Sequence, residues 1–242
     1  KTASTEGQTN GICPFHGHIL MSGASTPVLI LADANLLVKD VVSASFFDLN
    51  KAKLISMHWT PEIEAEYVEH RARIRARQIG HATQEKDLHW AAARIDVHKK
   101  YLVPSSTPVG WDEGVTLTGM MADPKYASLK TIPDPNDIHV AMAAAFMAES
   151  LKRPVVLATH NLGDLPQPTL EPFHVVVLHP GVILEMLHQK HPKAVAASLL
   201  KTCQDFQDPK ITQSEFLRSI SGSNQFDNPD LAKLIQAEWG HA

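Results

Sequence analysis

The stretch Val28-Leu29-Ile30-Leu31-Ala32-Asp33 decides the fold of this chain. Five consecutive apolar residues are typical of a strand that is buried on both faces of a parallel sheet, and the run ends at a carboxylate. Similar runs occur at 53–57, 155–159 and 175–178, separated by segments with helical periodicity. Strands that alternate with helices predict an α/β fold with a mainly parallel sheet.

The segments between these runs predict helices. Thr60-Pro61 has the sequence of a helix start, with Thr60 as the N-cap residue, and this helix is expected to end near Gln78. Between 103 and 133, where Pro and Gly recur, we expect loops and at most one short helix. The other helices are expected over 33–49, 85–101 and 134–151, and again from 181 onward.

The chain divides into three parts. Residues 1–25 lack sustained periodicity, and we expect a flexible leader or an expression remnant there. Residues 26–190 carry the strands and form the main domain, and residues 191–242 are expected to be an α-helical C-terminal appendage. In the leader, Cys13, His16 and His18 have no second ligand cluster at zinc-finger spacing, so a loose segment is favoured over a zinc site.

Two helix starts are predicted in the appendage. Thr212 and Glu215 fit a capping box, in which each end of the pair satisfies a backbone N–H of the other. Asn228-Pro229 fits a second start. The appendage of about 50 residues is too small for us to expect it to fold alone.

Composition restricts the class of protein. The chain has 242 residues, of which 44% are apolar, and this excludes disorder over most of its length. No run approaches the roughly 18–20 apolar residues of a membrane helix, and two cysteines are too few for a disulfide scaffold, so we expect a cytoplasmic protein. The 22 basic and 26 acidic residues give a net charge of −4, which excludes a protein that coats nucleic acid through bulk charge.

Four acidic residues are predicted to meet in one pocket. Asp33 and Asp164 follow strands, and sites in open parallel sheets form outside the carboxyl ends of the strands. Glu66 lies on the helix that begins at Thr60, and Asp137 begins the apolar face of the next helix but one. Such a cluster repels itself unless a divalent cation neutralises it, and carboxylate oxygens suit Mg²⁺ or Mn²⁺.

Each acid also has a purely structural interpretation. Asp33 is suited to the N-cap of the following helix, and Asp164 to the end of a turn. Asp134 and Asp137 flank Pro135 as an N-cap and its partner in the first turn. Glu69 precedes Arg73 by four residues, the spacing of an ordinary helical ion pair.

Three motifs resemble those of PIN domains, in their order and spacing, over about 28–189. The opening motif is matched by Leu31-Ala32-Asp33-Ala34-Asn35-Leu36-Leu37, and the central motif, in the form found in VapC-like toxins, by Asp134-Pro135-Asn136-Asp137-Ile138-His139-Val140-Ala141. The last motif is matched by Ala158-Thr159-His160-Asn161-Leu162-Gly163-Asp164-Leu165-Pro166. The segment Trp59-Thr60-Pro61-Glu62-Ile63-Glu64-Ala65-Glu66 is similar to the helix that supplies the family's glutamate. The resemblance implies a three-layer fold with a five-stranded, mainly parallel sheet flanked by helices, and metal-dependent cleavage of RNA.

The resemblance assigns roles to residues. The acidic quartet is matched by Asp33, Glu66, Asp137 and Asp164, with Asp33 and Asp137 as direct ligands of Mg²⁺ or Mn²⁺. Asp164 is expected to act directly or through water, and Glu66 as a ligand or as an acceptor that orients the attacking water. Around the acids, the supporting residues are expected to be Asn35, Thr159 and Asn161. Asn161 equally fits a left-handed turn, and Thr159 is also a common strand residue.

The match departs from the family pattern at two places. Ile138 follows Asp137 where such motifs often have arginine, so a basic contact is missing. Glu62 and Glu64 compete with Glu66 for the role of the helix-borne acid.

Cations for binding RNA phosphates are dense at only one place. Arg71, Arg73, Arg75 and Arg77 lie on the second half of the Glu66 helix, where Arg71 and Arg75 share a face. Arg71, Arg75 and His139 are candidate RNA contacts. The alternative for the two arginines is a solvated helix face with ion pairs, and the alternative for His139 is a histidine that packs against another helix.

Three functions remain open at this point. The first is the toxin of a VapBC-type pair, an endoribonuclease of a structured RNA such as tRNA that is expected to form a homodimer and to bind a small antitoxin. The second is a PIN-domain nuclease for RNA processing without an antitoxin, and the third is a non-catalytic PIN-like RNA-binding module. A haloacid-dehalogenase-like phosphatase is rejected, because it needs a second aspartate where this chain has Asn35.

Overall fold

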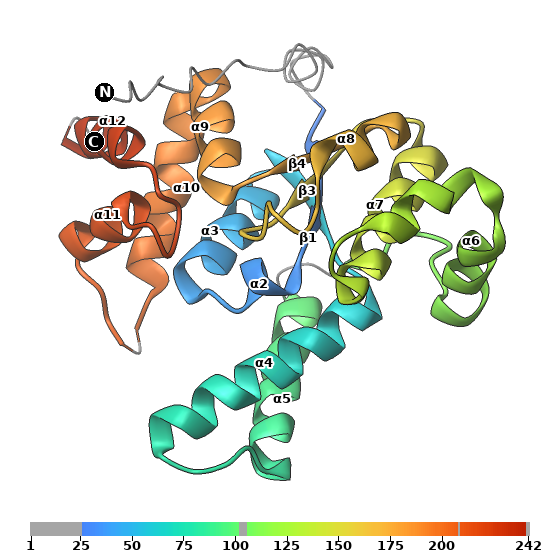
Figure 1. Cartoon of the computed structure of the whole chain (residues 1–242). Coiled ribbons are helices and arrows are strands. Elements are labelled where there is room, and N and C mark those ends of the chain that lie inside the picture. The colour runs from blue at the N-terminus through green and yellow to red at the C-terminus, as the bar shows by residue number, and fades with distance from the viewer. Residues whose placement is uncertain (1–25, 102–105, 208, 241–242) are drawn as a thin grey trace, which may run out of the picture.

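The computed structural model describes residues 26–101, 106–207 and 209–240. The leader expected over 1–25, with its Cys13, His16 and His18, lies outside the described residues. The centre of the described part is a parallel four-stranded sheet in the order β2-β1-β3-β4 (Figure 1). Its strands are β1 (Val28–Ala32), β2 (Ile55–His58), β3 (Val155–Ala158) and β4 (Val175–Leu178). The predicted α/β class and parallel sheet are confirmed, whereas the described residues form four strands and not the five of the PIN-like prediction.

The register of the strands brings their carboxyl ends to one edge. Ala158 pairs with Ala32 on one side and with Leu178 on the other. Just past these ends, Asp33 donates its backbone N–H to Ala158 O at 3.1 Å, and Thr159 donates to Leu178 O at 3.1 Å. All residues of β3 and β4 are buried, as expected of strands covered on both faces.

Helices follow the strands and cover the sheet. The predicted helix over 33–49 is interrupted at Val38 and Lys39, because α2 ends there and α3 begins at Asp40. The predicted helix over 134–151 is present, with a short 3₁₀ turn before the α-helix. These elements and the helix after β4 are α2 (Ala34–Leu37), α3 (Asp40–Lys51), η3 (Pro135–Asp137), α7 (Ile138–Leu151) and α9 (Pro180–Lys190).

A helical hairpin extends from the sheet (Figure 1). It consists of α4 (Pro61–Ile79) and α5 (Glu85–Tyr101), and both predicted helices are confirmed. Thr60 caps α4 as predicted, since its hydroxyl accepts the Ile63 N–H at 3.4 Å. Gly80 ends α4 with φ of 84°, a left-handed conformation that glycine adopts without strain.

The prediction of at most one short helix over 103–133 is wrong. The described part of this segment contains η1 (Glu113–Leu117), α6 (Thr118–Ala122) and η2 (Pro124–Thr131). Local caps start two of them, because Asp112 accepts the Val115 N–H and Asp123 accepts the Lys125 N–H. Two further short helices, α8 (Gln167–Leu170) and η4 (Glu171–Phe173), precede β4 and were not predicted.

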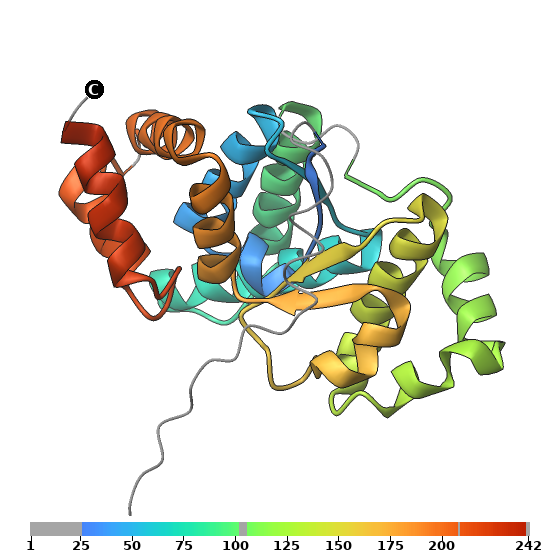
Figure 2. The same cartoon turned by 90° about the horizontal axis from the view of Figure 1, so that it is seen from above.

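The tail is helical, as predicted. Its helices are α10 (Pro192–Asp205), α11 (Gln213–Ser221) and α12 (Pro229–Gly240). The capping box of Thr212 and Glu215 is present, and Asn228 accepts the Leu231 N–H at 2.9 Å. In both views the tail helices and the α6–α7 segment lie on opposite sides of the sheet (Figures 1 and 2).

The tail is packed closely against the rest of the chain. Thr202 on α10 donates to Asp48 on α3 at 2.8 Å, and the ring of Phe226 stacks on Phe46 at 6.5 Å between centroids. Phe226 is fully buried. The tail therefore shares the core of the sheet domain and extends it.

Candidate functional site

Asp33 lies at the carboxyl end of β1 and is 4% exposed. Thr159 donates its hydroxyl to Asp33 Oδ2 at 2.7 Å, and the Asn35 side-chain amide donates to the same oxygen. Burial raises the pKa of Asp33, and the hydrogen bond from Thr159 opposes that shift. Asp33 is therefore a buried carboxylate held in one orientation by two polar neighbours.

A hydrogen-bond network joins the ends of β1 and β3. Asn35 donates to Thr159 Oγ1 at 3.0 Å and accepts the His160 N–H at 3.0 Å. Asn161 donates its backbone N–H to Thr159 Oγ1 at 2.9 Å and its side-chain amide to Asp164 Oδ2 at 2.5 Å. Asn161 does not have positive φ, so the alternative of a left-handed turn at this residue is wrong. The three residues expected to support the acids do contact them.

Asp134, Asp137 and Asp164 form a close group of acids. One carboxylate oxygen from each lies within 4.8 Å of the others. Asp137 Oδ2 is buried and has no hydrogen-bond partner among the residues that the structure describes. Burial raises the pKa of Asp137 to about 6, and repulsion from Asp33, Asp134 and Asp164 adds to the shift. This group is a ready set of oxygen ligands for a cation.

The sequence predicts Asp134 only as a helix cap. It is the N-cap, since Oδ1 accepts the Asn136 N–H at 2.9 Å. Its carboxylate nevertheless lies with Asp137 and Asp164. The signal was present in the sequence, because an N-cap and a residue three positions later lie on the same side of a first helical turn.

Glu66 is electrostatically joined to the same cluster from α4. Burial raises its pKa to about 7, and repulsion from Asp33 and Asp137 contributes next. His139 Nε2 lies 3.7 Å from Glu66 Oε1, so this candidate RNA contact stands beside the acids. A hollow between the starts of α4 and α7 is lined by Pro61, Glu62, Ala65, Glu66, Pro135, Asn136 and His139.

The competing acids of α4 have other partners. Glu62 accepts the indole N–H of Trp111 at 3.1 Å. Glu64 accepts the indole N–H of Trp59 at 3.0 Å and forms an ion pair with Lys99. Glu66, by contrast, is directed to the aspartates, since burial and then repulsion from Asp33 and Asp137 raise its pKa.

Arg71 and Arg75 are engaged within the chain. Arg71 donates to Asp40 at 2.6 and 2.8 Å and to Val38 O at 2.9 Å. The guanidinium of Arg75 lies 4.7 Å from the ring centroid of Trp90 on α5. These contacts connect α4 to α3 and α5. The ion pair of Arg71 was part of the alternative interpretation, but the solvated face was not found, because the Arg71 side chain is only 11% exposed.

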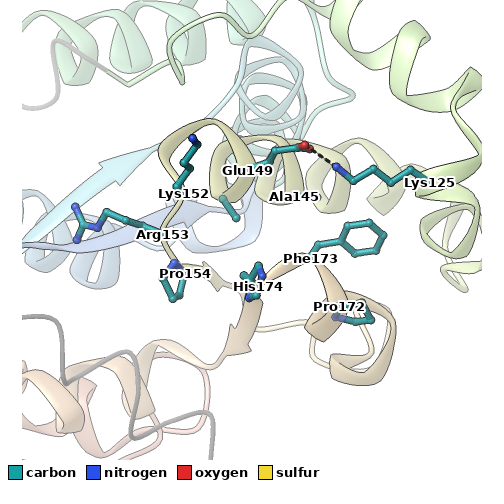
Figure 3. Close-up of a pocket in the computed structure, with 10 residues that line it drawn as sticks. Lys125, Ala145, Glu149, Lys152, Arg153, Pro154, Pro172, Phe173 and His174 are labelled. Carbon is teal, nitrogen blue, oxygen red and sulfur yellow. Dashed lines mark hydrogen bonds and ion pairs between the residues drawn. The ribbon is translucent and has the colours of Figure 1, made fainter.

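A second hollow lies at the opposite edge of the sheet (Figure 3). Pro154 and His174, which line it, directly precede β3 and β4, so it stands at the amino ends of these strands. Lys125 and Glu149 form an ion pair across its rim. None of the predicted site residues lines it.

A comparison of the chain with protein-family models, with curated proteins and with solved structures gives no match. No helix in the described ranges combines the length and the apolar character needed to cross a membrane.

The replacement Glu66→Gln is expected to stabilise the metal-free protein at about pH 8 but not at about pH 5. The pKa of Glu66 is raised from 4.5 to about 7 in the folded chain, so the folded state holds this proton more tightly than the unfolded state. The stabilisation that this proton gives is complete below the pKa of Glu66 in the unfolded state. It is lost as the pH rises through the pKa of Glu66 in the folded state. Glutamine avoids the loss because it carries no charge. Thermal unfolding of both proteins in EDTA measures the difference.

The effects of other titratable groups on stability cancel when the two proteins are compared at the same pH. Burial lowers the pKa values of His98 and His160 to about 4, so these groups act in the opposite direction as the pH falls. Both are present in each protein, and their effects cancel. A melting-temperature difference that is the same at both pH values would show that burial and repulsion do not raise the pKa of Glu66.

Proposed function

We propose that this chain is a divalent-metal-dependent ribonuclease of the PIN-like type. The observation that carries the proposal is the convergence of Asp33, Glu66, Asp137 and Asp164, joined by Asp134, at the carboxyl ends of parallel strands. In such sheets this edge is where ligand sites form. The PIN-like type has a five-stranded sheet, of which the described residues form four strands.

The donor set fits a hard cation. All five side chains offer carboxylate oxygens, which suit Mg²⁺ or Mn²⁺. The buried Asp137 Oδ2 lacks a hydrogen-bond partner among the described residues, and the mutual repulsion of the acids is relieved by positive charge. In this proposal Asp33, Asp137 and Asp164 hold the metal, with Glu66 beside them.

The chain's own residues define the remaining chemistry. A bound Mg²⁺ or Mn²⁺ supplies Lewis acidity, which favours ionisation of water and offsets charge on the phosphate. Thr159 and Asn35 fix the orientation of Asp33, and Asn161 fixes that of Asp164. Glu66, on the opposing helix, completes the ligand set or accepts the proton of the attacking water.

The proposal is tested by incubating the full-length protein with single-stranded and structured RNA in Mg²⁺ or Mn²⁺. We expect internal cleavage, its loss in excess EDTA and its return when the metal is restored. Cleavage that persists unchanged in EDTA, or no cleavage of any RNA with either metal, would overturn the proposal.

The biological role follows the resemblance of the motifs to VapC-type toxins. We propose that the protein is a toxin that cuts a structured RNA such as tRNA in the cytoplasm, forms a homodimer and is blocked by a small antitoxin. Expression in a host without an antitoxin is then expected to arrest growth. Undisturbed growth together with RNA cleavage in the test tube would favour an RNA-processing nuclease instead.

A further inference from the structure

The outer face of α4 continues from Glu66 as a row of basic side chains. Arg73 and Arg77 follow Glu66 by seven and eleven residues, which places them on the same helical face, and His70 lies beside them. All three are exposed. At about 1.5 Å of rise per residue, the two arginines lie roughly 10 and 16 Å along the helix from Glu66.

This row faces away from the contacts that fasten the hairpin. Each of Arg73 and Arg77 is two residues from an arginine that packs inward, and two residues correspond to about 200° of rotation around a helix. Arg71 donates to Asp40, and the guanidinium of Arg75 lies over the ring of Trp90. The outward pair is therefore separate from the stabilising pair.

The two outward arginines have no ion-pair partner among the residues that the structure describes. The ion pair of Glu69 with Arg73, predicted from their spacing, is not among the ion pairs of the described residues. Two cations four residues apart on a helix repel each other. Partial desolvation lowers the pKa of His70, followed by repulsion from Arg73 and Arg77, while Asp33 raises it. His70 thus lies within electrostatic range of both the arginines and the acidic site.

We propose that His70, Arg73 and Arg77 form a track that binds the phosphates of single-stranded RNA leading away from the acidic site. The proposal rests on the ribonuclease function above and extends it to the path of the substrate. Cations spaced along a straight helix match the repeated charges of a phosphate backbone. The track begins beside the carboxylates, so one strand can reach both.

An acidic protein segment is the other partner that suits a basic face. RNA is favoured because the track shares its helix face with Glu66, and because a substrate held at the acids must leave the site along some surface. The experiment distinguishes RNA from a protein partner because it measures the binding and cleavage of RNA directly.

The experiment measures RNA binding and cleavage by the full chain with Arg73→Gln and Arg77→Gln combined. Removing two phosphate contacts from single-stranded RNA is expected to reduce the slope of log affinity against log salt by about 1.4. The same counterion release gives a loss of affinity on the order of tenfold at physiological salt. Binding is measured in Ca²⁺ and cleavage in Mg²⁺, each with a long RNA and with a dinucleotide. The dinucleotide is too short to reach the arginines, and we expect its cleavage to be unchanged.

The matched control combines Lys193→Gln and Arg218→Gln, which remove the same charge from exposed positions on α10 and α11. We expect it to keep the salt slope and the affinity of the wild type. The pair Arg73→Lys and Arg77→Lys keeps the charge and is expected to retain the slope. If the double glutamine variant does not fold, Arg77→Glu gives a second measurement of the same effect.

The outcomes separate the two proposals. A wild type that cleaves RNA, with an arginine variant of unchanged slope and affinity, overturns the track alone and leaves the face to a protein partner. A wild type that neither binds nor cleaves RNA overturns both. Equal losses in the arginine variant and in the control would show a bulk charge effect and would also overturn the track.

Discussion

The replacement Asp137→Asn is expected to lower RNA cleavage by on the order of a hundredfold or more. The side chain keeps its size but loses the charge that binds the metal. Burial raises the pKa of Asp137 to about 6 and repulsion from Asp33, Asp134 and Asp164 adds to the shift, so Asp137 is electrostatically coupled to three other acids. One of its oxygens is buried without a partner among the described residues, so an amide at this place is left with an unsatisfied polar group. The initial rate of cleavage at saturating Mg²⁺ measures the effect.

The control for this variant is Asp96→Asn, which removes one negative charge from an exposed position on α5. Its cleavage rate is expected to equal that of the wild type. If Asp137→Asn cleaves RNA as fast as Asp96→Asn, the assignment of the acidic cluster as the catalytic site is wrong.

The replacement Gly181→Ala is expected to destabilise the protein by about 3 kcal/mol or more. A Cβ atom at Gly181 would lie 1.7 Å from the backbone oxygen of Phe226 and 2.9 Å from its carbonyl carbon. Backbone atoms cannot turn away as a flexible side chain does, so the tail segment must move from its place on α9. For a chain of this size we expect the melting temperature to fall by roughly 10 °C.

The matched control is Gly119→Ala, because a Cβ there meets no atom within 4 Å. This change in α6 is expected to be neutral or slightly stabilising. Equal melting temperatures for the two alanine variants would contradict the close packing of the tail on the sheet domain.

The tail segment also contacts the candidate site, so Gly181→Ala is expected to affect the site as well as stability. His160 donates through Nε2 to Gln225 O at 2.7 Å, and its ring meets His179 edge-on at 4.8 Å between centroids. His160 stands between Thr159 and Asn161, the residues that hold Asp33 and Asp164. Movement of the tail is therefore expected to disturb the acids as well as the core.

Elements with strong local signals could be predicted from the sequence. The apolar run at Val28 and the Thr60-Pro61 start of α4 depend on neighbouring residues alone, and both predictions are confirmed. The capping box at Thr212 is a local signal of the same kind. The short helices between Asp112 and Thr131 were missed because their caps are ordinary turn residues until buried side chains such as Trp111 and Tyr126 anchor them.

The candidate site could be predicted only in part, because tertiary contacts decide which charges are free. Helical spacing showed that Arg71 and Arg75 share a face, but not that Trp90 and Asp40 cover it. In the same way, the sequence assigned Glu66 to the site but left Glu62 and Glu64 as competitors for that role. Glu62 is bound by Trp111 and Glu64 by Lys99, and both partners come from other parts of the chain.

We propose that the carboxylates at the strand ends bind a divalent metal and cleave RNA with it. This claim is tested most directly by titrating Mn²⁺ into the EDTA-treated full chain and its Asp137→Asn variant while RNA cleavage is followed. We expect wild-type cleavage to rise from zero to a plateau, and the variant to stay near zero at every concentration. Wild-type cleavage that does not depend on Mn²⁺, or a variant that reaches the same plateau, would contradict the claim.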